Sequence, residues 1–85
     1  MNKAERQKHA KTLRDFAKDY LAHGLREYRG EPDMVRMIRG DAADYRKIAA
    51  LILAGKINEA GIRAQSMDTA PRENIPQEVW DFICQ

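Results

Sequence analysis

The sequence contains very little cysteine: Cys84 is the only one among its 85 residues. An intrachain disulfide is therefore excluded, which is typical of a protein from the reducing cytoplasm. Long hydrophobic runs are also missing, because the longest, 48–54, is too short to span a bilayer. The start of the chain, MNKAERQKHAK, is too polar for a signal peptide. We therefore expect a cytoplasmic protein with no membrane contact.

Residue patterns typical of enzymes are missing as well. The sequence has no glycine-rich phosphate loop, no Ser-His-Asp order and no zinc-finger spacing. Cys84 has no histidine near it in the sequence, so we interpret it as a small apolar residue that ends the last helix. Asp19, His23 and Glu27 would share one face of a helix, but one such row does not make a closed metal site. We expect no catalytic residue, metal, cofactor or small-molecule substrate.

Strand-like alternation is absent too, and helical periodicity takes its place. Five helix-breaking residues separate the periodic segments: Pro32, Gly40, Gly55, Pro71 and Pro76. The pattern predicts an all-α fold, a single domain over 1–85 built as a compact bundle of four to five helices with a long N-terminal helix. The 44% of hydrophobic residues is close to normal for a globular chain.

The first predicted helix covers 2–29 and would be about 40 Å long. Its first part, 1–9, has no apolar face and is expected to fray. Gly24 either weakens the helix or marks a close approach by another backbone. One continuous half of the helix is apolar, formed by Ala10, Leu13, Phe16, Ala17, Tyr20, Leu21, Gly24, Leu25 and Tyr28.

Gly30 is predicted to end this helix, and a short helix from Pro32 is predicted to stop near Gly40. Asp41 is then the expected N-cap of a third helix that runs to Ala54. Two further helical segments are expected, 57–67 and a last helix with Pro76 at its first position. The segment 67–76 between them is predicted to contain turns, with one helical turn restarting at Pro71.

The helix over 42–54 is apolar on almost every side, which places it in the middle of the bundle. Ile48, Leu51 and Ile52 are its predicted buried centre. The first helix has a wider apolar arc, about 180°, than the ~100° that one packing surface needs. We therefore expect a homodimer or a partner-bound state through Leu13, Phe16 and Tyr20.

Trp80 has two interpretations. It can dock the last helix onto the core, which we favour, or it can be an exposed anchor for a partner protein, because Trp and Tyr dominate binding hot spots. The second interpretation adds Trp80 to the candidate protein interface.

The charge of the chain is distributed unevenly. Residues 1–29 carry eight Lys and Arg against four Asp and Glu, and residues 48–85 carry three against five. Four cations occupy a narrow arc of the first helix and are candidate nucleic-acid contacts: Lys11, Arg14, Lys18 and Arg29. An ordinary solvated face with pairs such as Lys11–Asp15 is the alternative, and it is the one that we favour.

Two functions remain for a chain of this kind. The first is a small non-enzymatic protein-interaction module that binds or masks a partner surface or self-associates. The alternative is a nucleic-acid-binding accessory protein that uses the basic stripe of the first helix.

Overall fold

The computed structural model describes residues 2–84, and every regular element in this range is a helix. The five helices are α1 (Lys3–Glu27), α2 (Pro32–Leu53), α3 (Ile57–Gln65), α4 (Thr69–Glu73) and α5 (Gln77–Ile83). The predicted all-α bundle with a long first helix is therefore confirmed.

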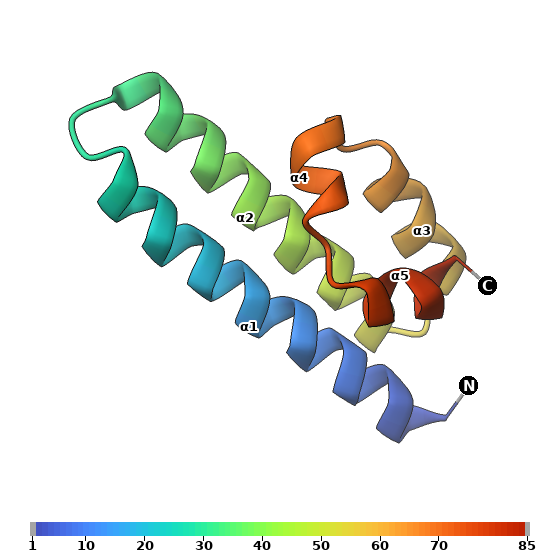
Figure 1. Cartoon of the computed structure of the whole chain (residues 1–85). Helices are drawn as coiled ribbons and strands as arrows, with labels where there is room; N and C mark the ends of the chain where they lie inside the picture. The colour runs from blue at the N-terminus through green and yellow to red at the C-terminus, as the bar shows by residue number, and fades with distance from the viewer. Residues whose placement is uncertain (1, 85) are drawn as a thin grey trace.

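α1 and α2 form a long antiparallel hairpin (Figure 1). Gly30, with a φ of 86°, lies in the turn between them, where a positive φ favours glycine. α3 packs beside α2, and α5 packs on α1 and α3, so the C-terminal helices cover one side of the hairpin. We call this side the front and the opposite side the rear. The covered end (3–20 and 41–53) is the base of the hairpin, and the end that extends past the C-terminal helices (21–40) is its tip.

Small residues let α1 and α2 approach closely. The buried positions between them include Ala10, Ala17, Gly24, Ala42 and Ala49. A Cβ atom on Gly24 would lie 2.7 Å from Cγ2 of Ile38. Gly24 therefore does mark a close approach, although the neighbour is a side chain rather than the predicted backbone.

The predicted break at Gly40 is wrong, because α2 runs unbroken from Pro32 to Leu53. Asp41 is not an N-cap: its Oδ2 accepts a hydrogen bond from the Tyr20 hydroxyl at 2.8 Å. A glycine inside a helix costs only roughly 1 kcal/mol. An unbroken helix keeps Ile38, Ala42 and Tyr45 buried on one side, which outweighs that cost.

Both ends of α1 differ from the predicted bounds. The helix begins at Lys3, where the Asn2 side chain accepts a hydrogen bond from the Glu5 amide at 2.8 Å. Residues 3–9 are thus helical in the structure, and their fraying stays a prediction. The helix ends at Glu27, so Arg29 lies in the following turn and does not continue the basic arc.

The core lies in the base of the hairpin. Its largest fully buried side chains are Tyr45, Leu13, Ile48, Ile52 and Val79. The prediction for Ile48 and Ile52 is confirmed, but Leu51 is only partly buried. Leu51 lies on the side of α2 that faces α3, where the two helices leave a hollow.

The segment 67–76 is fixed by two hydrogen bonds to its backbone. The Tyr45 hydroxyl donates to the carbonyl of Pro71, and Nε1 of Trp80 donates to the carbonyl of Arg72 at 3.1 Å. Pro76 occupies the N-cap position and not the first helical position, so α5 begins one residue later than predicted.

Candidate binding surfaces

The residues predicted to form a protein interface are largely used inside the chain. Leu13 is fully buried and offers no surface to a partner, which corrects its assignment to an interface. Phe16 and Tyr20 pack against the core, with ring centroids 5.2 and 5.3 Å from that of Tyr45. Trp80 is partly buried and hydrogen-bonded to the α4 backbone, so it docks α5. Much of the wide apolar arc of α1 is thus covered by the chain's own helices.

The two tyrosines beside Asp41 form a polar group within this aromatic cluster. Burial, followed by the hydrogen bond to Asp41, raises the pKa of Tyr20 to about 12. Burial also raises the pKa of Tyr45 above its usual value. Both hydroxyls act as donors, that of Tyr20 to the Asp41 carboxylate and that of Tyr45 to the backbone carbonyl of Pro71.

Ile62 is the most exposed large aliphatic side chain among the described residues, at 65%. It belongs to α3, whose other apolar residues, Ile57, Ala60 and Ala64, face the core. Ile62 stands at the edge of two hollows. One lies between α2 and α3, and the other, between α3 and α5, includes Ile83 and Cys84 in its lining.

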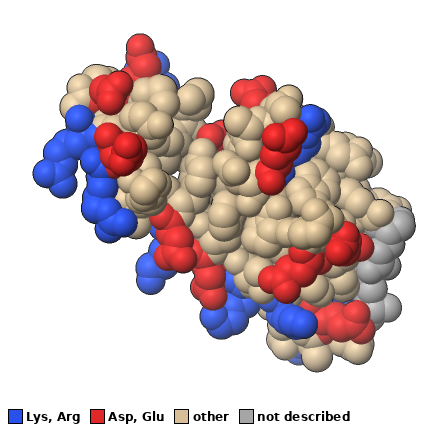
Figure 2. Space-filling view, in the orientation of Figure 1, with Lys and Arg blue, Asp and Glu red and all other residues tan. Residues whose placement is uncertain are grey.

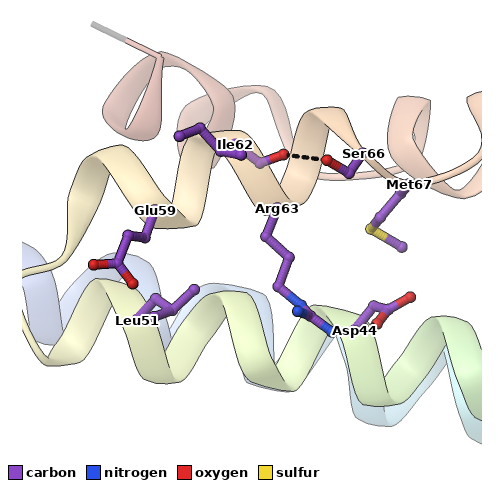
Figure 3. A pocket seen from close by; sticks show the side chains of 7 residues that line it. All are labelled: Asp44, Leu51, Glu59, Ile62, Arg63, Ser66 and Met67. Atoms are coloured by element: carbon purple, nitrogen blue, oxygen red, sulfur yellow. Dashed lines mark hydrogen bonds and ion pairs between the residues drawn. The ribbon is translucent and has the colours of Figure 1, made fainter.

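The hollow between α2 and α3 has a volume of about 540 Å³ and is lined from both helices (Figure 3). Its lining residues are Asp44, Leu51, Glu59, Ile62, Arg63, Ser66 and Met67. Arg63 reaches from α3 to α2, and its Nη2 lies 3.2 Å from Oδ1 of Asp44. Nε of the same guanidinium is buried and has no hydrogen-bond partner within residues 2–84.

A second hollow continues the first along α2. It shares Leu51 and Arg63 and is completed by Lys47, Ala50, Ala54 and Lys56. We call the two hollows together the α2–α3 groove. The groove follows α2 from Asp44 to Ala54, which corresponds to about 15 Å of helix. Its middle is apolar at Leu51, and carboxylates and ammonium groups lie around it.

The basic stripe of α1 is smaller than predicted. Nζ of Lys11 lies 2.6 Å from Oδ2 of Asp15, and this hydrogen bond is the main cause that lowers the pKa of the Asp15 carboxyl. The ordinary i,i+4 pair thus forms, as the alternative interpretation predicted. Arg14 and Lys18 are exposed and form no ion pair with any other residue from 2 to 84.

The candidate metal and nucleophile residues are dispersed. His23 and Glu27 line a hollow at the tip together with Tyr20 and Tyr28, and Asp19 does not join them. No group of three His, Cys, Asp or Glu side chains in the described part of the chain could hold a metal ion. Cys84 is exposed rather than packed as a small apolar residue, and its Sγ lies 3.6 Å from Nε2 of Gln65.

Comparisons with protein-family models, with curated proteins and with solved structures found no match to this chain. None of the helices between residues 2 and 84 is both long enough and apolar enough to cross a membrane. The α2–α3 groove and the basic residues of the hairpin are thus the features on which a proposal of function can rest.

Proposed function

We propose that this protein is a small non-enzymatic interaction module that binds a partner protein through the α2–α3 groove. The exposure of Ile62 beside this groove is the observation that carries the proposal. Isoleucine is among the residues most often buried in folded proteins. Covering such a side chain is worth about 1.5–3 kcal/mol, a large gain for a single contact.

The composition of the groove favours an amphipathic helix as the bound segment. Such a helix places apolar side chains at i and i+3 or i+4 into a groove and keeps its charged side chains at the rim. Leu51 supplies an apolar contact inside the groove, and Ile62 supplies one at its outer edge, on the side of α3 turned away from α2 (Figure 3), while Glu59 and Lys56 are exposed at the rim. A partner with charges of both signs around two apolar anchors would be complementary to this surface.

Arg63 adds a polar contact to the proposed complex. Its side chain is 40% exposed beside the groove. A backbone carbonyl of a bound segment can therefore accept a hydrogen bond from the exposed part of its guanidinium. Self-association through this groove is the homodimeric form of the same function.

Affinity capture from a nuclease-treated lysate of the source organism, with Ile62→Ser and Leu53→Ser variants, tests the proposal. Leu53 is the matched control, because it is also an exposed aliphatic residue, at 42%, but does not line the groove. We expect wild-type protein and Leu53→Ser to retain the same partner and Ile62→Ser to lose it. Capture that is equal for all three proteins would contradict the proposal.

Sedimentation at micromolar concentration separates the two forms of the proposal. A dimer that Ile62→Ser dissociates and Leu53→Ser does not would assign a second copy of this chain to the groove. A monomer at all concentrations would leave a different protein as the occupant.

A further inference from the structure

The continuity of α2 through Gly40 brings together cations that a helix break would separate. Successive residues of an α-helix are about 100° apart, so Arg39 and Arg46, seven residues apart, lie within about 20° of each other around the axis. Both side chains are exposed, and neither forms an ion pair within the described chain. They are about 10 Å apart along the helix.

These two arginines lie on the rear of the hairpin. The side of α2 that faces α3 is marked by Asp44, which pairs with Arg63. Arg39 and Arg46 are roughly 140–160° away from Asp44 around α2. They therefore point away from the C-terminal helices that cover the front.

α1 contributes two more cations to the rear. Its front side is marked by Phe16, which packs on Tyr45, and by His9, which stacks on Phe82 of α5. Arg14 and Lys18 are about 140–180° away from these two residues around α1. α1 and α2 pack against each other along their length, with axes typically 8–10 Å apart. The four cations therefore form two short rows on one side of the hairpin.

We call Arg14, Lys18, Arg39 and Arg46 the rear basic face. On this side of α2 the arginines are flanked by the small side chains of Ala43 and Ala50, and Leu53, seven residues beyond Arg46, is 42% exposed. The acidic residues of α2 lie elsewhere: Asp41 is bonded to Tyr20, Asp44 to Arg63, and Asp33 is beside Arg36. Figure 2 shows the front, where carboxylates and cations are interspersed along α1 and carboxylates also lie over the C-terminal helices.

We propose that the rear basic face binds the phosphate backbone of a duplex nucleic acid. Each neutralised phosphate releases counterions, and arginine forms bidentate hydrogen bonds with phosphate oxygens. The small residues around the arginines of α2 allow a polyanion to approach both rows of cations. Binding is independent of base sequence, because the face presents cations for phosphates and no Asn or Gln side chain between its rows for base edges.

A lipid surface fits this face less well. A helix that lies on a membrane inserts large apolar side chains such as Trp, Phe and Leu on its bound side. Leu21 and Leu25 are partly buried in the hairpin, and among the described residues Leu53 is the one large apolar side chain exposed beside Arg39 and Arg46. The rear basic face and the α2–α3 groove meet at Ala50, but none of the four cations of the face lines the groove. Substitutions in one surface therefore test it separately from the other.

Fluorescence anisotropy with labelled 20-base-pair duplexes of DNA and of RNA tests the proposal. Four phosphate contacts predict a slope of log K against log salt of about −3.6 for DNA, or a loss of roughly 100-fold in affinity between 50 and 200 mM salt. Arg39→Gln combined with Arg46→Gln should reduce the magnitude of the slope by about two and lower the affinity at 50 mM salt by at least about tenfold. The DNA and RNA duplexes together show which nucleic acid is preferred.

Lys8→Gln combined with Arg26→Gln is the matched control. It removes the same charge from exposed positions of α1 that lie about 80–120° away from Arg14 and Lys18. The control should keep the wild-type slope, and circular dichroism should show that both double variants remain helical. Equal losses in the two double variants would overturn the proposal, because net charge alone would then account for binding. Absence of duplex binding at 50 mM salt would also overturn it, and binding only to vesicles with phosphatidylserine would assign the face to a lipid surface instead.

Discussion

The base and the tip of the α1–α2 hairpin are built from the same two helices but are stabilised in different ways. In the base, three further helices cover the pair, and Leu13, Tyr45 and Ile48 are completely inaccessible. In the tip, α1 and α2 pack mainly against each other, and Met37 is 52% exposed. The comparison shows that two helices alone bury little here except where a glycine lets them approach, as Gly24 does with Ile38.

Truncating one isoleucine at each end should give the largest effect. Ile48→Ala in the base should lower the free energy of unfolding by about 2–5 kcal/mol, because the surrounding helices cannot close the cavity. The loss in free energy of unfolding for Ile38→Ala in the tip should lie at the lower end of this range, because α1 and α2 can move toward each other and partly fill the cavity. Urea denaturation measures both changes, and equal losses would show that the tip is as tightly packed as the base.

Adding a methyl group at two glycines should give an intermediate effect. A Cβ on Gly61 would lie 2.9 Å from the backbone oxygen of Ile83, and one on Gly24 would lie 2.7 Å from an Ile38 side-chain atom. Overpacking typically costs about 1–3 kcal/mol, and the higher helix propensity of alanine offsets roughly 1 kcal/mol. We expect Gly61→Ala to be the more destabilising, because backbone moves less easily than a side chain.

The clash at Gly24 can be tested by relieving it. Ile38→Ala removes the Cγ2 and Cδ1 atoms that a Cβ on Gly24 would meet at 2.7 and 2.8 Å. Gly24→Ala should therefore cost less in the Ile38→Ala background than in the wild-type protein. Thermal denaturation of the two single variants and the double variant measures this coupling. If the two losses of stability simply add, the neighbour of Gly24 has been misidentified.

Removing the Tyr20 hydroxyl should have a smaller effect that depends on pH. Tyr20→Phe loses one hydrogen bond to Asp41, worth about 0.5–1.5 kcal/mol at neutral pH. The pKa of Tyr20 is raised from the ordinary value of 10 to about 12 in the folded protein. Its contribution to stability is therefore fully present below pH 10 and is lost as the pH rises toward 12.

Urea denaturation between pH 9 and pH 12 measures this loss. The decline of wild-type stability should be steeper than that of Tyr20→Phe, and Tyr28→Phe at the tip is the matched control. Parallel declines in the wild-type protein and Tyr20→Phe would contradict the raised pKa of Tyr20.

Gly40→Ala should give the smallest change, and it is a gain. A Cβ at Gly40 would meet nothing within 4 Å, so alanine adds helix propensity without a clash. We expect a stabilisation of about 0.5–1 kcal/mol, visible as a higher melting temperature. A loss of stability would mean that α2 bends or breaks at this residue in solution.

The glycines also show which parts of the fold could be predicted from the sequence. Periodicity predicted the helices. Gly30 and Gly55 lie between helices, as predicted, and both have a positive φ. Gly40 is also a helix-breaking residue, but it lies inside α2. The helix stays unbroken there because this keeps Ile38, Ala42 and Tyr45 buried on one side. Local propensity does not contain that tertiary information.

The candidate surfaces were harder to predict than the helices. Ile62 lies opposite Ile57, Ala60 and Ala64 on the helical wheel, and this misplaced large aliphatic residue was the available signal for the groove. Arg39 and Arg46 were hidden by the predicted break at Gly40. Leu13 was misassigned because a wide apolar arc does not reveal whether helices of the same chain or a partner cover it.

The stacking of His9 on Phe82, with ring centroids 4.2 Å apart, has a consequence for the order of folding. It joins the first helix to the last, so nearly the whole chain must be closed into a loop before the two rings meet, whereas α1 and α2 meet through one short turn. The hairpin can thus form early, and α5 docks onto a partly assembled surface. Amide hydrogens of α5 should therefore exchange with solvent through local undocking while those of α2 exchange only when the whole domain unfolds.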